Sequence, residues 1–147
     1  MKYLKQLFTF VFVLLLMGCF HTDDDSKQLT LDRNMSIWNK ANISDYQYTF
    51  RRSCFCFSEE DVVIIVKAKV ITEAFYSPSG VYLGENELDR LHTIPKLFGI
   101  VQEAIDSNAA SLNVTYNSEF GYPEKIDIDR IKEAVDDEVV YYAIEFQ

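Results

Sequence analysis

The stretch that decides the fold is Tyr46-Gln47-Tyr48-Thr49-Phe50-Arg51-Arg52-Ser53-Cys54-Phe55-Cys56. Its even-numbered positions hold aromatic residues, Arg52 and two cysteines, whereas the odd-numbered positions are polar up to Ser53. Because successive side chains of a β-strand point to opposite faces, this pattern predicts a strand with one buried and one solvated face. Strands of this kind are typical of an antiparallel sheet that is covered on one side.

Further strands are expected after this stretch. Val62–Val66 is a β-branched run typical of a central strand, and it follows a polar turn over 58–61. Lys67-Ala68-Lys69 is expected to reverse the chain tightly, although no glycine or asparagine marks this turn. A second turn over 117–123 is centred on Gly121. The strands expected from alternation are 46–56, 62–66, 70–76, 112–116, 126–128 and 139–146.

Two helices are expected at the starts of the two halves of the domain. Helical spacing of Leu31, Met35 and Trp38 predicts the first helix over 29–41. Thr93 can cap the second helix, and Pro95 suits its first turn, where a missing N–H has no cost. The buried stripe expected on this helix contains Leu97, Val101, Ala104 and Ile105, with Phe98 beside it.

The order of elements is therefore helix, three strands, helix, three strands. Because most strands alternate between apolar and polar residues, we expect an α+β fold in which two helices pack on one face of an antiparallel sheet of about six strands.

The N-terminus has the features of an export signal. Two lysines come first, and the apolar run that follows over 7–17 is too short for a membrane span of about 20 residues. The run ends in Leu16-Met17-Gly18-Cys19, which resembles the lipidation sequence of bacterial lipoproteins. We predict that 1–18 is a signal peptide and that Cys19 carries the lipid, including palmitate. An uncleaved anchor or a buried helix ending by chance in Gly-Cys is the alternative.

The residues after the signal indicate how the protein is placed. Residues 19–28 contain three consecutive aspartates and are expected to form a solvated tether to a single domain over 29–147. Because aspartate after the lipidated cysteine retains a lipoprotein at the inner membrane, Phe20 favours the outer membrane. The expected location is the cell envelope, with the domain facing the periplasm.

The net charge excludes one class of partner. The chain carries a formal charge of −9, and removal of 1–18 takes away Lys2 and Lys5 without any acid, which leaves −11. A domain this acidic is unsuited to phosphate backbones, so no nucleic acid is expected as a partner.

Cys54 and Cys56 are the most distinctive candidate site, because they remain as an even pair in an oxidising compartment once Cys19 is lipidated. Residues two apart in a strand are roughly 6.6 Å apart at Cα, and a disulfide needs Cβ atoms at about 3.8 Å. A bridge between them therefore requires the strand to end there. A redox-active disulfide and a soft-metal site, for example for Cu(I), are the functional alternatives. A structural bridge or two small buried hydrophobes are the others.

Other chemistry has little support in the sequence. The acidic group of Asp127, Asp129, Asp136, Asp137 and Glu138 lacks the spacing of a calcium loop, so a solvated face is expected. Neither metal ligands, cofactors nor catalytic residues are predicted, because His92 and the pair Glu119 and Glu124 match no catalytic pattern. Tyr82, Tyr116 and Tyr122 are candidates for an exposed binding patch.

Several motifs resemble a family of small bacterial lipoproteins that carry a domain of unknown function. The similarity covers most of 36–147. The motifs are Tyr46-x-Tyr48-x-Phe50, Cys54-Phe55-Cys56, Thr93-Ile94-Pro95-Lys96-Leu97-Phe98, Gly121-Tyr122-Pro123 and Asp136-Asp137-Glu138. The resemblance supports the lipoprotein prediction and the domain boundary and implies no catalytic residue.

These observations together predict a membrane-anchored envelope lipoprotein that is not an enzyme and that binds another envelope protein as an accessory domain. The alternative is a thiol-redox or copper-handling protein that uses Cys54 and Cys56.

Overall fold

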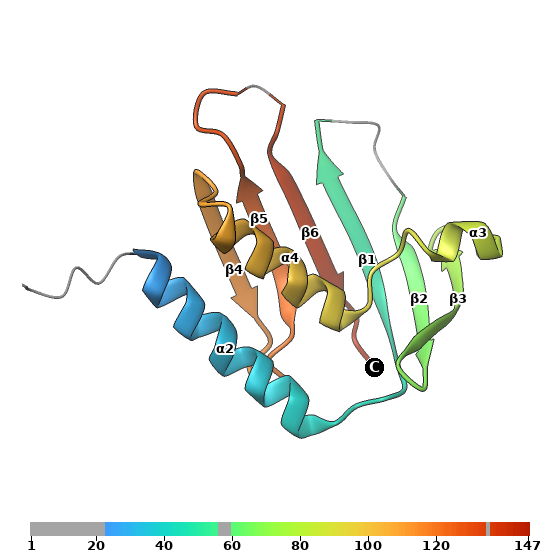
Figure 1. Cartoon of the computed structure of the whole chain (residues 1–147). Coiled ribbons are helices and arrows are strands. Elements are labelled where there is room, and N and C mark those ends of the chain that lie inside the picture. Colours follow the sequence, from blue (N-terminus) through green and yellow to red (C-terminus); the bar gives the residue numbers. More distant parts are fainter. Residues whose placement is uncertain (1–22, 56–59, 135) are drawn as a thin grey trace, which may run out of the picture.

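The computed structural model describes residues 23–55, 60–134 and 136–147 (Figure 1). The predicted signal peptide over 1–18, the lipidation site Cys19 and the second strand cysteine, Cys56, lie outside the described residues. The helices are α2 (Asp23–Ala41), α3 (Glu85–Leu88) and α4 (Ile94–Asp106). The strands are β1 (Tyr46–Cys54), β2 (Val62–Lys67), β3 (Val70–Tyr76), β4 (Ser111–Tyr116), β5 (Pro123–Asp129) and β6 (Val139–Ile144).

The described strands form one open sheet in the order β3-β2-β1-β6-β5-β4. Every neighbouring pair is antiparallel. The predicted α+β class and the order helix, three strands, helix, three strands are therefore confirmed. Because β1 lies in the middle, between β2 and β6, its alternating side chains set the two faces of the whole sheet.

The core lies between one face of the sheet and the helices. Tyr46, Tyr48 and Phe50 of β1 are buried, as their spacing predicted. Figure 1 shows α2 and α4 side by side on the same face of the sheet. The stripe predicted on α4 is buried, and so is Phe98 beside it; the stripe residues are Leu97, Val101, Ala104 and Ile105.

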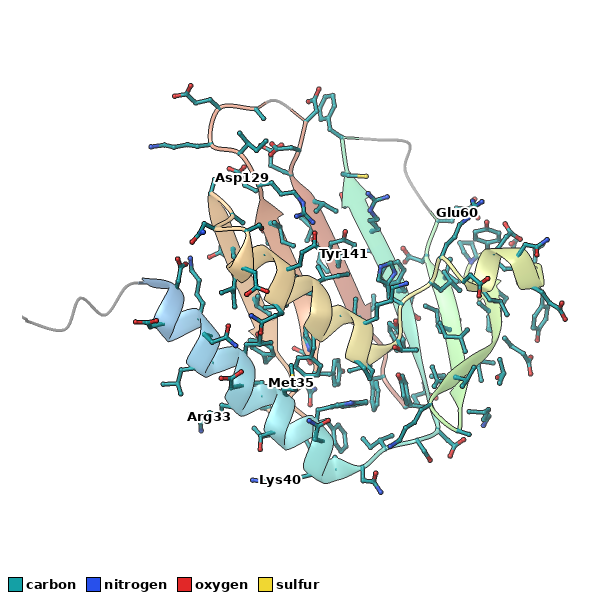
Figure 2. The ribbon with its side chains drawn as sticks, viewed as in Figure 1. Arg33, Met35, Lys40, Glu60, Asp129 and Tyr141 are labelled. Carbon is teal, nitrogen blue, oxygen red and sulfur yellow. The ribbon has the colours of Figure 1, made fainter. Side chains whose placement is uncertain are left out.

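The helix α2 begins earlier than predicted, at Asp23, so residues 23–28 of the predicted tether are helical. Acidic residues in a first helical turn are favoured by the positive end of the helix dipole, which suits the run Asp23–Asp25 to this position. Gln28 and Gln102 join α2 to α4, since each side-chain amide donates to the other's carbonyl at 3.0 and 2.8 Å. On its outer side, α2 carries the exposed Arg33 and Lys40 (Figure 2).

Two turns were predicted at the correct places. Ala68 and Lys69 reverse the chain between β2 and β3 with φ of 50° and 68°, which are left-handed values at non-glycine residues. The second turn places Gly121 against α2 with φ of 74°. A Cβ there would approach the backbone oxygen of Asn34 to 2.5 Å, so only glycine fits this contact.

The segment between β3 and α4 contains the short helix α3, which the sequence did not predict. Tyr82 forms an isolated bridge to Phe75 of β3, and the Leu83 N–H donates to the Ala74 carbonyl at 2.9 Å. Glu87 then accepts the Gly84 N–H at 2.8 Å and fixes the start of α3. These contacts hold the segment against β3, the strand at one edge of the sheet.

Candidate functional site

Two tyrosine hydroxyls on β1 fix the start of α4. The Tyr46 hydroxyl accepts the Ile94 N–H at 3.1 Å, and the Tyr48 hydroxyl donates to the carbonyl of His92. Thr93 caps α4 as predicted, because its side chain accepts the Lys96 N–H at 3.4 Å. The alternating tyrosines of β1 therefore determine where residues 92–94 lie over the sheet.

The His92 ring consequently lies on the next residue of the same strand face. It stacks on Phe50 with a centroid separation of 5.3 Å and an interplanar angle of 17°. Tyr141 of β6 lies at 6.0 Å in a tilted arrangement. The Nδ1 atom of His92 is buried and has no hydrogen-bond partner among the described residues. Buried polar atoms normally have a partner, so this nitrogen marks the place as a candidate binding position.

The His92 imidazole is neutral at neutral pH. Burial lowers its pKa from 6.5 to about 4, and the positive charges of Lys96 and Arg52 act in the same direction. A neutral imidazole has one N–H donor and one acceptor nitrogen, so it can bind either kind of polar group.

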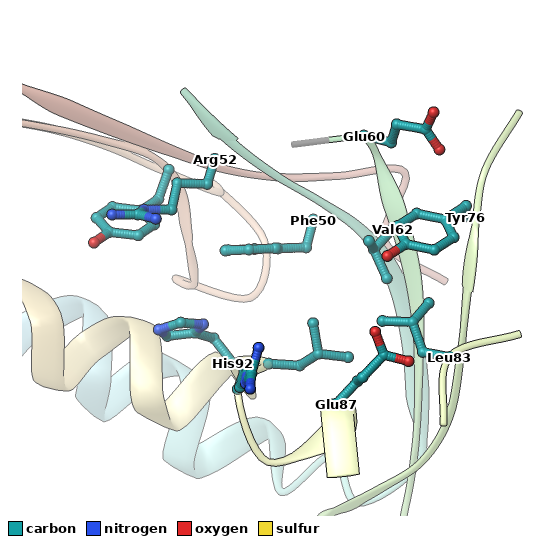
Figure 3. A pocket seen from close by; sticks show the side chains of 11 residues that line it. Phe50, Arg52, Glu60, Val62, Tyr76, Leu83, Glu87 and His92 are labelled. Atoms are coloured by element: carbon teal, nitrogen blue, oxygen red, sulfur yellow. The ribbon is translucent and has the colours of Figure 1, made fainter. Parts of the chain in front are cut away.

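His92 belongs to an open pocket of about 840 Å³ (Figure 3). This volume is within the roughly 300–1,000 Å³ range of small-molecule sites. The pocket lies over β1 and β2, between the α3 segment and the start of α4. Its floor and walls are formed by Phe50, Val62, Tyr76, Leu83, Leu91 and Tyr141, and its charged residues are Arg52, Glu60, Glu87 and Arg90.

The opposite face of the sheet is not covered by α2 or α4 (Figure 1). The register places alternate residues of β1, β2, β3 and β6 on this face, which we call the open face. Thr49 and Arg51 of β1 lie in its middle. Its apolar residues are half-buried and are Val63, Ile65, Phe75, Val140, Tyr142 and Ile144.

Charged groups divide the open face into paired and acidic parts. Arg51 binds both carboxylate oxygens of Asp61 at 2.6 and 2.5 Å and lies 5.9 Å from the centroid of the Tyr142 ring. The hydrogen bond to Arg51 lowers the pKa of Asp61, so this pair is ionised at neutral pH. Glu145 accepts the Thr49 hydroxyl at 2.7 Å, and Glu73 of β3 is exposed on the same face.

Cys54, the described member of the thiol pair predicted from the sequence, is the last residue of β1. The strand ends at Cys54, and Phe55 is an exposed bend, so the chain leaves the sheet where a bridge requires it to. Cys54 is disulfide-bonded. Since Cys56 and Cys19 lie outside the described residues, the Cys54–Cys56 pairing stays a prediction.

The acidic residues are dispersed. Asp127 pairs with Lys125 at 2.9 Å, and Asp137 accepts the Ile131 N–H at 2.8 Å. Among the described residues, no group of three His, Cys, Asp or Glu side chains could hold a metal ion. Glu124 accepts from the Asn117 side chain at 2.8 Å.

The expected patch of exposed tyrosines is wrong. Tyr122 is only 4% exposed and stacks on Phe146 at 4.7 Å, within an aromatic cluster that also contains Trp38. Tyr116 is half-buried against Phe98, and only Tyr82 is largely exposed, at 63%. Tyr122 is buried because it follows Gly121, whose close approach to α2 brings the next ring into the core.

The pocket itself was missed by sequence reasoning. From the sequence, His92 stands out only as an isolated candidate for catalysis or metal binding, and Arg52 as a member of the β1 alternation. The available signal was the capped helix start at Thr93 beside a strand with alternating aromatic residues.

The fold and these sites define a small α+β domain with one helix-covered and one open sheet face. The chain belongs to the family of unknown function DUF6174, which it matches over residues 30–147. No curated protein and no solved structure matches the chain. In the part of the chain that the structure describes, no helix has the length and apolar character needed to cross a membrane.

Proposed function

We propose that this protein is a lipid-anchored lipoprotein of a bacterial envelope whose domain is a non-enzymatic module that binds another protein through the open face. The export pattern before Cys19 supports the anchor. The open face supports the binding role and carries this part of the proposal.

The open face has the composition of an interface. Six apolar side chains from β2, β3 and β6 lie around Thr49 and Arg51 on a surface that α2 and α4 leave uncovered. Water-soluble monomers rarely leave large contiguous apolar patches exposed, and such patches commonly mark interaction sites. Tyr142, with Arg51 beside its ring, belongs to the residue types that dominate binding energy at interfaces.

The charges around this surface indicate the kind of partner. Arg51 is neutralised by Asp61, and Lys125 by Asp127, whereas Glu73 and Glu145 add negative charge that exceeds the positive charge of the exposed Lys67 at the end of β2. The whole chain is also strongly acidic. The partner that fits is therefore a folded envelope protein with an apolar contact surface and a basic rim.

The anchor is tested by feeding labelled palmitate to a bacterial host that expresses the full chain. Label should enter the protein and disappear in the Cys19→Ala variant. Equal labelling of the wild type and the Cys19→Ala variant, or no labelling of either, would contradict lipidation at Cys19.

The open face is tested by placing a charge in its apolar part. The full chain is extracted in detergent, and the native mass of its assembly is compared with those of Tyr142→Glu and Thr115→Glu. Thr115 is exposed on the polar part of the same face and is the matched control. The assembly should be lost only in Tyr142→Glu. A chain that is monomeric in all three forms, or an assembly of two copies of itself, contradicts the proposed partner.

The thiol-redox function is the second candidate, because Cys54 is disulfide-bonded. Sulfurs in a disulfide are unavailable to Cu(I), so this observation favours redox exchange over copper handling. The test is the reduction potential of the Cys54 disulfide, measured in glutathione redox buffers. A disulfide that these buffers cannot reduce would be structural and would exclude the thiol-redox function.

A further inference from the structure

The pocket at His92 separates an apolar floor from a charged rim. Phe50, Val62 and Tyr141 form the floor and are buried, whereas Glu60, Glu87 and Arg90 are exposed at the rim. Small-molecule sites combine these two features, since apolar walls provide affinity and a few polar groups fix orientation.

Two groups of polar side chains lie apart in the pocket, whereas Arg90 lies on the same segment as Glu87 and its backbone N–H donates to the Glu87 carbonyl at 3.1 Å. Figure 3 shows Arg52 and His92 toward one end, and Glu60 and Glu87 toward the other, with Phe50 and Val62 between them. Arg52 has an interaction within the chain, and a guanidinium has five N–H donors, so it can bind a carboxylate in addition. Glu87 accepts the Gly84 N–H through one oxygen and has a second carboxylate oxygen.

This distribution excludes simpler ligands. A purely anionic ligand would be repelled by the carboxylates of Glu60 and Glu87. A purely cationic ligand would be repelled by the two guanidinium groups, because like charges repel each other at short range. A purely apolar ligand would leave the buried Nδ1 of His92 without a partner.

We propose that this pocket binds a short peptide with free ends, whose carboxylate lies toward Arg52 and whose ammonium group lies toward Glu60 and Glu87. An apolar side chain of the peptide covers Phe50, and a backbone amide or carbonyl pairs with His92. The site is on the helix-covered side of the sheet and is independent of the open face.

The test is calorimetric titration of the detergent-purified full chain with the tripeptide Ala-Leu-Ala, its N-acetyl form, its C-terminal amide and free leucine. The unblocked tripeptide should bind most tightly. Blocking either end should weaken binding about two- to fivefold, as expected for exposed ion pairs. Equal affinity for blocked and unblocked forms, or no heat with any peptide, overturns the proposal.

Variants place the binding at this pocket. Glu60→Gln should weaken the unblocked tripeptide and leave affinity for the N-acetyl form unchanged, because that form lacks the ammonium group. Glu73→Gln removes an exposed carboxylate from the open face and is the matched control, which should bind like the wild type. Leu83→Trp should fill the pocket and abolish binding while circular dichroism shows a folded chain. Retained binding in Leu83→Trp, or equal losses in the two glutamate variants, assigns the peptide to another site and refutes the inference.

Discussion

Acidification should destabilise this domain through His92. Its pKa is about 4 in the folded protein, against 6.5 for an unperturbed histidine. The unfolded chain therefore binds more protons between these two values, so stability is fully present above pH 6.5 and is lost as the pH falls toward 4. For a single group with these pKa values the loss between pH 7.5 and pH 5 is at most about 2 kcal/mol, and because the ring is only partly buried, solvent screening reduces the expected loss to about 1 kcal/mol.

The measurement is urea unfolding of the detergent-purified full chain at several pH values, followed by fluorescence of Trp38. This is the only tryptophan and is 5% exposed, in contact with Tyr46 at 5.5 Å. The comparison is His92→Gln, which cannot titrate. Hydrogen bonds lower the pKa values of Asp45 and Asp61 from 3.8, so their stabilising contributions are lost mainly below pH 4. Identical pH profiles of the wild type and His92→Gln between pH 5 and 7.5 would refute a buried neutral imidazole.

Three further substitutions, with Gly80→Ala as the control for the first, test the packing and the backbone conformation. Gly121→Ala should destabilise the fold by about 2–4 kcal/mol in the same urea assay, because its Cβ would meet the Asn34 backbone. The control Gly80→Ala also has a positive φ, of 67°, but no atom within 4 Å, so it should cost about 1 kcal/mol. Equal losses of stability in the two variants would contradict the predicted contact. Tyr48→Phe should cost about 1–3 kcal/mol, since the His92 carbonyl loses its donor, and an unchanged midpoint in thermal unfolding would show that this bond contributes nothing. Lys69→Gly should increase the free energy of unfolding by about 1 kcal/mol, because glycine adopts the positive φ of 68° without strain, and so should raise the thermal midpoint. A lowered midpoint would contradict this.

The sheet was predictable because its signals are local. Alternation from Tyr46 to Cys54 identified β1 and the burial of Tyr46, Tyr48 and Phe50 on one face, because successive side chains of a strand point to opposite faces. Thr49, on the face expected to be solvated, is nevertheless only 3% exposed. The reversal at 67–69 was also expected, although Ala68 and Lys69 adopt left-handed conformations that usually favour glycine or asparagine. Tertiary pairing of the flanking strands determines that turn.

The features that sequence reasoning missed depend on contacts between distant residues. Gln28 extends α2 by bonding to Gln102, and nothing near residue 28 indicates this partner. Tyr122 was expected at the surface, yet its position after Gly121 buries it. His92 acquires its stacked, desolvated position only because tyrosine hydroxyls on β1 bind the chain on both sides of Thr93.

The central proposal is that a membrane-anchored domain binds a partner protein through the open face, and site-specific photo-cross-linking in intact cells tests it most directly. A photoreactive residue replaces Tyr142 on the open face or Asn39 on the exposed side of α2. One discrete adduct with a basic envelope protein is expected at position 142 and none at position 39. The adduct at position 142 should be lost when Cys19→Ala is added, because the chain is then no longer anchored. Equal adducts at both positions, or no adduct at position 142, would contradict the proposal.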